Sequence, residues 1–214
     1  PLLAHGQARE VMVIGGGDGG MIEEVLKHRA VNRVTLVEID AGVIEFSKKY
    51  LGMICGDAFD DPRTNIVIAD GLVHAETTGD RYDVIIVDST DPIGPGEALF
   101  SNRFYQACQR CLAPGGVLVT QNGVPFMQPG ELANSVKAMR ALFSDAGCYT
   151  ASVPTYIGGS MAFGWATDND ALRATGLPLL VSRFDTANID TRYYSPAIHQ
   201  AAFVLPRYIQ DLVG

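Results

Sequence analysis

Two short stretches of this sequence place acidic side chains at the ends of predicted buried strands. Residues 15–20 read GGGDGG and follow the apolar run VMVI, while residues 87–96 read VDSTDPIGPG and follow the apolar run VII. A glycine-rich turn between a buried strand and a helix N-terminus normally binds anions. Asp18 lies inside the first stretch and would repel a phosphate, so we predict a nucleoside that carries positive charge.

The glycine turn and the acid that follows it have the spacing of a nucleoside site. Gly15, Gly17 and Gly20 satisfy the pattern G-x-G-x-x-G, and Glu38 lies near the end of the next apolar run. An acid about twenty residues after such a turn binds ribose hydroxyls in dinucleotide-binding folds. The alternative interpretation is that Glu38 caps the helix that follows it.

A second acid and glycine, Asp70 and Gly71, follow the third apolar run. The carboxylate can accept a hydrogen bond from an adenine amino group, and the glycine leaves room for the base, although Asp-Gly is also a common turn. An S-adenosyl compound suits these residues better than NAD or FAD does. Its sulfonium and ammonium groups are attracted by Asp18, whereas a pyrophosphate is repelled.

The loop at residues 87–96 supplies the candidate chemistry. It carries Asp88 and Asp91 three residues apart, and its prolines, Pro95 among them, stiffen it. Two neighbouring carboxylates stay ionised when cations lie between them; the alternative is a turn whose aspartates cap local N–H groups. With Asp18, the loop gives three acids and no obvious base for a substrate carboxylate. We therefore expect decarboxylated S-adenosylmethionine as the donor and a cation such as a diamine as the acceptor.

Apolar, β-branched segments alternate with amphipathic ones, which is typical of βαβ units around a parallel sheet. The expected strands are 10–14, 33–39, 65–69, 82–88 and 115–121, and the expected helices are 19–29, 40–52, 101–112 and 130–146. We expect Ser101 to cap the third of these helices and residues 114–116, PGG, to end it. The runs at 149–156 and 160–168, separated by IGG, predict a hairpin at the sheet edge, and two tail helices follow at 196–203 and 206–214.

Length and composition limit the function classes. The chain has 214 residues, of which 47% are hydrophobic, and a net charge of −8. We expect one domain, 1–214, that binds neither nucleic acid nor an anionic membrane. The sequence has no apolar run of 18 residues, no visible leader and no initiator methionine. Its four cysteines lack the spacing of a zinc site, and we expect them to be reduced and the protein to be cytoplasmic.

Together, the motifs GGGDGG, VEID, ADG, DSTDPIGPGEALF, PTYIGG and RYYSPAIHQAAFVLP resemble the polyamine aminopropyltransferases, most closely the bacterial spermidine synthases. The resemblance runs through essentially the whole chain in order. It implies an α/β, Rossmann-like fold of the class I methyltransferase type. That fold has a mostly parallel seven-stranded sheet, a C-terminal antiparallel hairpin and helices on both faces. Family members also have an N-terminal β-domain, which we expect to be missing here, and the resemblance implies a homodimer or a higher homo-oligomer.

The resemblance also implies a reaction, which is the transfer of an aminopropyl group from decarboxylated S-adenosylmethionine to putrescine. The products are spermidine and 5′-methylthioadenosine. In the donor pocket, Asp18 would hold the amine of the aminopropyl tail and Glu38 the ribose. The other donor residues implied are Gly15, Gly17, Asp70, Gly71 and Pro95, of which Asp70 and Gly71 would hold the adenine.

The remaining site residues would hold the acceptor. The resemblance assigns proton acceptance to Asp88, the far amine of putrescine to Asp91, and one wall of the diamine pocket to Tyr156, with Ser89 and Thr90 beside the substrate. No metal and no tightly bound cofactor is expected, because a sulfonium is already a good leaving group. Two alternatives stay open: an enzyme like putrescine N-methyltransferase that uses S-adenosylmethionine, and a catalytically silent nucleoside-binding fragment.

Overall fold

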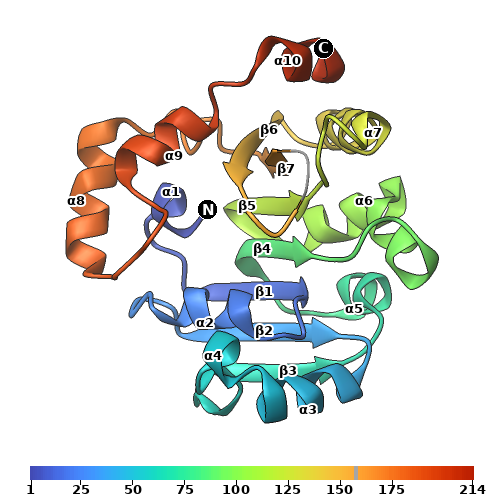
Figure 1. The fold of residues 1–214 in the computed structure, drawn as a ribbon, viewed down its shortest axis with the longest axis vertical. Helices are drawn as coiled ribbons and strands as arrows, with labels where there is room; N and C mark the ends of the chain where they lie inside the picture. The colour runs from blue at the N-terminus through green and yellow to red at the C-terminus, as the bar shows by residue number, and fades with distance from the viewer. Residues whose placement is uncertain (157–158) are drawn as a thin grey trace.

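The computed structural model describes residues 1–156 and 159–214, and it has one seven-stranded sheet in the order β3-β2-β1-β4-β5-β7-β6. Strands β1 to β5 run parallel, and β7 pairs antiparallel with both β5 and β6 (Figure 1). This confirms the predicted fold class. The strands are β1 (Glu10–Gly15), β2 (Arg33–Glu38), β3 (Thr64–Ile68), β4 (Tyr82–Asp88), β5 (Leu112–Gln121), β6 (Asp145–Ser152) and β7 (Ser160–Thr167).

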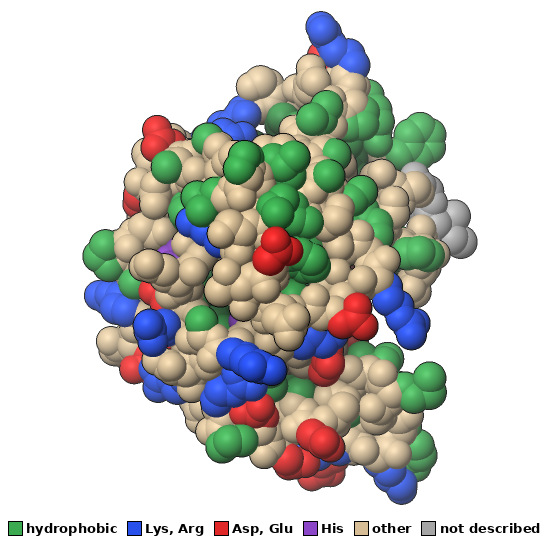
Figure 2. All heavy atoms as spheres, turned by 90° about the vertical axis from the view of Figure 1, so that its left-hand side faces the viewer, with side chains coloured by type: hydrophobic (Ala, Val, Ile, Leu, Met, Phe, Trp, Pro, Cys, Tyr) green, Lys and Arg blue, Asp and Glu red, His purple; other side chains and the backbone are tan. Residues whose placement is uncertain are grey.

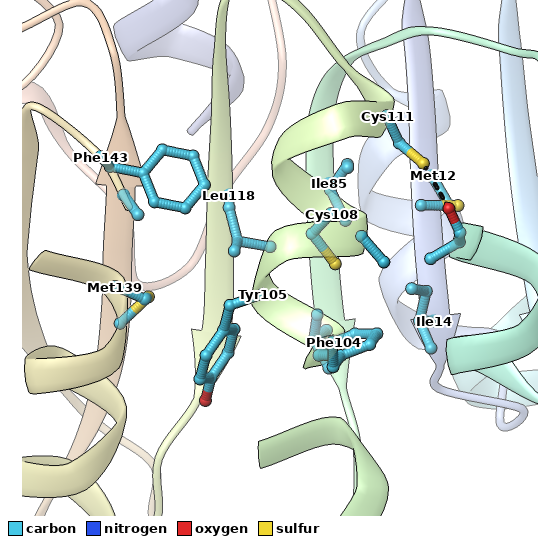
Figure 3. Packing of buried hydrophobic residues seen from close by; sticks show 14 of the residues in the cluster. Met12, Ile14, Ile85, Phe104, Tyr105, Cys108, Cys111, Leu118, Met139 and Phe143 are labelled. Carbon is cyan, nitrogen blue, oxygen red and sulfur yellow. Dashed lines mark hydrogen bonds between the residues drawn. The ribbon is translucent and has the colours of Figure 1, made fainter. Parts of the chain in front are cut away.

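Helices cover both faces of the sheet, and each face has its own apolar core. On one face α5, α6, α7 and α10 contribute buried residues; Figure 3 shows Phe104 and Tyr105 of α6 against Leu118 of β5 and Ile85 of β4. The other core is formed with α1 to α4. The helices are α1 (Leu2–His5), α2 (Gly20–Leu26), α3 (Ala41–Tyr50), α4 (Gly52–Cys55), α5 (Gly71–Thr77), α6 (Asn102–Cys111), α7 (Pro129–Arg140), α8 (Leu177–Ala187), α9 (Pro196–Ala202) and α10 (Arg207–Val213), with short 3-10 turns η1 (Ala58–Asp60) and η2 (Gly94–Phe100).

Helix α6 begins where the sequence predicts, but it does not end where the sequence predicts. Ser101 caps the helix, and its hydroxyl accepts a hydrogen bond from the Phe104 amide at 3.2 Å. The helix ends at Cys111, before Pro114, because Leu112 already pairs with Tyr82 of β4. A register irregularity then brings Val117 beside Val84. The strand predicted at 115–121 therefore begins three residues earlier, and Pro114 does not end the helix.

The predicted helix at 130–146 is too long. Helix α7 ends at Arg140, and Asp145 begins β6, whose eight residues pair with β7 from Asp145–Thr167 to Ser152–Ser160. Strand pairing with a distant segment overrides the local helical pattern here. The first hairpin strand consequently begins four residues before the predicted run at 149–156. The hairpin does close the sheet edge; Ile157 and Gly158 of the predicted IGG connection lie outside the described residues.

Four helices, α1, α4, α5 and α8, were not predicted from the sequence, and α1 and α4 have only four residues each. Helix α5 is short and begins at the glycine of the ADG motif, which reads as a turn. Helix α8 buries only Leu180 within its span.

Candidate active site

The predicted site residues meet at the carboxyl ends of the parallel strands. From β1 the chain builds β2 and β3 on one side and then crosses to β4 on the other, so β1 and β4 flank a topological switch point. A cavity of about 490 Å³ opens there, at the end where the arrowheads of β1 to β5 point in Figure 1. All the predicted site residues except Asp91 line it: Gly15, Gly17, Asp18, Glu38, Asp70, Gly71, Asp88, Ser89, Thr90, Pro95 and Tyr156.

The glycine turn abuts the loop that follows β4. Gly15 has a φ of 77°, and a Cβ atom added to it would lie 2.2 Å from the backbone oxygen of Asp88. A Cβ atom on Gly16, whose φ is 65°, would lie 2.9 Å from Oδ2 of Asp88. Glycine is required at these two positions because the turn is both left-handed and in close contact with that loop. Asp18 projects from the same turn, and its Oδ1 accepts a hydrogen bond from the Gly20 amide at 3.0 Å.

Glu38 does not act as the helix cap that the alternative interpretation proposed. The N-cap of α3 is Asp40, whose Oδ1 accepts the Gly42 amide at 2.8 Å. Glu38 is 8% exposed; its Oε1 accepts the Asp40 amide at 3.1 Å, and its Oε2 faces Gly17. A second carboxylate oxygen is therefore presented towards the glycine turn, where a ribose could bind.

Asp70 combines both interpretations of the ADG motif. It is the N-cap of α5, and its Oδ1 accepts hydrogen bonds from the Leu72 amide at 2.8 Å and the Val73 amide at 3.0 Å. Asp70 nevertheless lines the cavity. Gly71 has a packing role: a Cβ atom there would lie 2.4 Å from Cγ2 of Ile14. The glycine therefore lets α5 approach β1 closely, as well as leaving room at the cavity wall.

The charge at the cavity is negative. Burial raises the pKa of the Asp88 carboxyl above its usual value, and the nearby Asp18 carboxylate raises it further. Among the described residues, the cavity lining includes no Lys, Arg or His side chain. Figure 2 views the opposite end of the molecule from the arrowheads, and there Lys and Arg side chains lie among acidic ones. The cavity is suited to bind a cation and to exclude an anion.

Removing the Asp88 charge should stabilise the fold. A carboxyl whose pKa is raised by folding favours the folded state below its unfolded pKa, and that contribution is lost as the pH rises through the folded pKa. We expect Asp88→Asn to raise the free energy of unfolding at pH 7 and to have a smaller effect at pH 3. Urea titrations at both pH values measure this. Asp170→Asn, at an exposed site, serves as the matched control, and equal effects of both variants would contradict the prediction.

Asp91 does not line the cavity with the other predicted residues. The sequence suggested that Asp88 and Asp91 raise the pKa of one another, but the acid that raises the pKa of Asp88 is Asp18. The Asp91 carboxylate instead affects the pKa of Glu131, which lies in the first turn of α7. Burial raises the pKa of Glu131, and the charge of Asp91 raises it further, to about 7. Sequence reasoning missed Glu131. The available signal was that β4 and β5 are neighbours, so the segments that follow them share one edge.

The described residues contain no group of three or more His, Cys, Asp or Glu side chains that could hold a metal ion. Cys55, Cys108, Cys111 and Cys148 are all buried and free. Within the same residues, none of the helices has the length and apolar character needed to cross a membrane.

Comparisons with known proteins agree with this fold and site. Residues 1–175 match the family model described as the spermine/spermidine synthase domain. The chain is 56% identical to the polyamine aminopropyltransferase of Ruegeria sp. (strain TM1040), covering 99% of this chain and 75% of that protein. It is 54% identical to polyamine aminopropyltransferase 1 of Pseudomonas aeruginosa, covering 100% of this chain and 75% of that protein. The chain therefore spans about three quarters of the length of these relatives.

Solved structures give the same assignment. A spermidine synthase in complex with the transition-state analogue AdoDATO superimposes with a TM-score of 0.93 at 35% identity, over 100% of this chain and 72% of the other. The spermidine synthase from Thermotoga maritima superimposes with a TM-score of 0.89 at 32% identity, over 100% of this chain and 70% of the other. The chain belongs to the spermine/spermidine synthase family and is an aminopropyltransferase, which confirms the resemblance found in the sequence.

Proposed function

We propose that the protein transfers the aminopropyl group of decarboxylated S-adenosylmethionine to putrescine, giving spermidine and 5′-methylthioadenosine. The observation that carries this proposal is the cavity at the switch point, which brings Asp18 and Asp88 together with no basic side chain among its described lining residues. An intact methionine tail carries a carboxylate, which these acids would repel. A tail that ends in an amine alone is attracted by the same acids.

The donor is assigned to the glycine-turn side of the cavity. Asp18 would bind the amine of the aminopropyl tail, Glu38 the ribose hydroxyls, and Asp70 the adenine amino group through the oxygen that does not cap α5. Gly15 and Gly17 would allow close backbone approach, while Gly71 and Pro95 would line the adenine end. The spermidine synthase that holds the analogue AdoDATO superimposes over the whole chain, which supports a single cavity for the donor.

The acceptor is assigned to the loop after β4. An amine nitrogen of putrescine attacks the methylene carbon next to sulfur, the carbon–sulfur bond breaks, and its electron pair stays on sulfur as a neutral thioether. A primary amine has a pKa of about 10, so it must lose a proton to become a nucleophile. Asp88 would accept that proton, and its raised pKa makes it a stronger base than an ordinary aspartate. Ser89, Thr90 and the half-exposed Tyr156 would form the walls beside the diamine.

The test uses both possible donors. Calorimetry of the purified protein should show tighter binding of decarboxylated S-adenosylmethionine than of the intact form, and an end-point assay with putrescine should yield spermidine. Tighter binding of the intact form with methylated putrescine as the product would assign a methyltransferase instead. Donor binding without any product would indicate a catalytically silent protein. Light scattering on the same sample tests the predicted homodimer.

A further inference from the structure

The acidic surface continues from Asp91 to a residue that the family resemblance did not assign. Strands β4 and β5 are parallel neighbours, so the loop after β4 and the segment after β5 emerge at the same edge of the sheet. Asp91 belongs to the first segment, and Glu131 lies in the first turn of α7, which follows the second. The Asp91 charge acts on Glu131, and neither residue lines the cavity that holds Asp88.

Glu131 is held in place but is not neutralised. Gln128 orients it: the Gln128 Oε1 accepts the Val124 amide at 3.1 Å, and its Nε2 donates to Oε2 of Glu131 at 3.4 Å. The other oxygen of Glu131, Oε1, is buried and has no hydrogen-bond partner among the described residues. A buried acceptor without a partner is costly, so this oxygen is expected to receive a donor from a bound molecule.

The surroundings of Glu131 are polar and buried. Burial raises the pKa of Tyr105 on α6 to about 12, and the Glu131 charge contributes to this rise. The Tyr105 hydroxyl donates a hydrogen bond to Ser135, one turn beyond Glu131, at 2.9 Å. Figure 3 shows the Tyr105 hydroxyl at the end of the core where the arrowhead of β5 lies, which is the edge of the active site. Asn122, fully buried directly after β5, has a side-chain nitrogen that finds no hydrogen-bond partner in the described part of the chain. No Lys, Arg or His within the described chain forms an ion pair with Asp91 or Glu131.

We propose that Glu131 is a specificity-determining residue that, with Asp91, binds the far ammonium of the acceptor. The inference rests on the proposed function, because it extends the same acceptor site. The edge then carries two pairs of interacting acids, Asp18 with Asp88 and Asp91 with Glu131. The attacking amine of the diamine would meet Asp88, while Asp18 holds the donor amine, and the far ammonium of the diamine would meet the Asp91–Glu131 pair. An acceptor without a second ammonium leaves the Asp91–Glu131 pair without a counter-ion.

The first test is Glu131→Gln, which removes the charge and keeps the shape of the side chain. We expect kcat/KM for putrescine to fall about ten- to a hundredfold, mainly through KM, because a charge-assisted hydrogen bond to the substrate is lost. Calorimetry should show weaker putrescine binding in the presence of 5′-methylthioadenosine, with the affinity for 5′-methylthioadenosine unchanged. Glu45→Gln, at an exposed position on α3, changes the net charge equally and should behave like the unmodified protein.

The pH dependence provides a readout that a purely structural residue would not alter. The titratable groups that face Glu131 are Asp91, from the loop after β4, and Tyr105, from α6. Glu131 is charged above its pKa of about 7 and neutral below it. The ratio of kcat/KM for putrescine between the unmodified protein and Glu131→Gln should therefore be largest above pH 7 and approach one below it, because putrescine and Asp88 ionise alike in both proteins.

Several results would overturn the inference. Unchanged putrescine binding and KM in Glu131→Gln would do so, as would a ratio that does not vary with pH. Glu131→Gln and Asp91→Asn should also be non-additive, because both act on one ammonium; strict additivity would contradict a shared cation. If the unmodified protein makes no spermidine, the proposed function fails, and putrescine calorimetry then still tests Glu131 by itself.

Discussion

Asp88→Asn is expected to lower turnover by about a hundred- to ten-thousandfold, which is the usual contribution of a general base. The amide has nearly the same shape as the carboxyl but cannot accept the proton of the attacking amine. Donor binding should remain measurable, because the donor contacts are assigned to the glycine turn, Glu38 and Asp70. Spermidine formation at saturating substrates measures the effect, and calorimetry with 5′-methylthioadenosine checks the donor site.

Two comparisons make this result specific to Asp88. Asp170→Asn changes an exposed aspartate and should leave turnover unchanged. The residual rate of Asp88→Asn should rise with pH, because free putrescine amine then becomes more abundant without help from the protein. Turnover within a few-fold of the unmodified protein would remove Asp88 from the role of proton acceptor.

Gly15→Ala should cause the largest loss of stability among the site residues. A side chain at a φ of 77° adopts a strained backbone conformation, and its Cβ atom would lie 2.2 Å from the backbone oxygen of Asp88. Since neither a strand end nor the loop after it can move freely, we expect a loss of about 2–5 kcal/mol in the free energy of unfolding. At about 2–4 °C per kcal/mol for a chain of this size, thermal unfolding should detect the change clearly.

Gly52→Ala is the matched control for the glycine turn. A Cβ atom on Gly52 would meet nothing within 4 Å, and its φ is not in the left-handed region. Because alanine favours a helix more than glycine does, this variant should be neutral or slightly more stable. A similar melting temperature for Gly15→Ala and Gly52→Ala would show that the close approach at Gly15 is not required.

The parallel part of the fold could be predicted from the sequence because local pattern determines it. Each of β1 to β4 is a short apolar run flanked by turn residues, and the predicted strand at 82–88 has the observed bounds. The errors lie where distant pairing decides the structure. Pairing with β7 starts β6 at Asp145, and pairing with Tyr82 extends β5 back to Leu112.

The candidate site divides in the same way. The glycine turn, Glu38, Asp70 and Asp88 each lie at or just after the carboxyl end of a strand, so the parallel sheet brings them to one edge and the sequence could locate them. Glu131 follows β5 by ten residues and has no motif around it. Its proximity to Asp91 depends on β4 and β5 being neighbours in the sheet, so that the segments after them share one edge, and no local pattern encodes that order.

The two oxygens of Asp70 link ligand binding to helix order. One oxygen holds the first amides of α5, so the side chain cannot rotate without leaving Leu72 and Val73 unpaired. An adenine bound by the other oxygen would thus meet a group that is already fixed, and it would lose little conformational entropy in the protein. By reciprocity, a bound nucleoside would hold the cap in place. The amides at the start of α5 would then exchange their hydrogens with solvent more slowly when the cavity is filled.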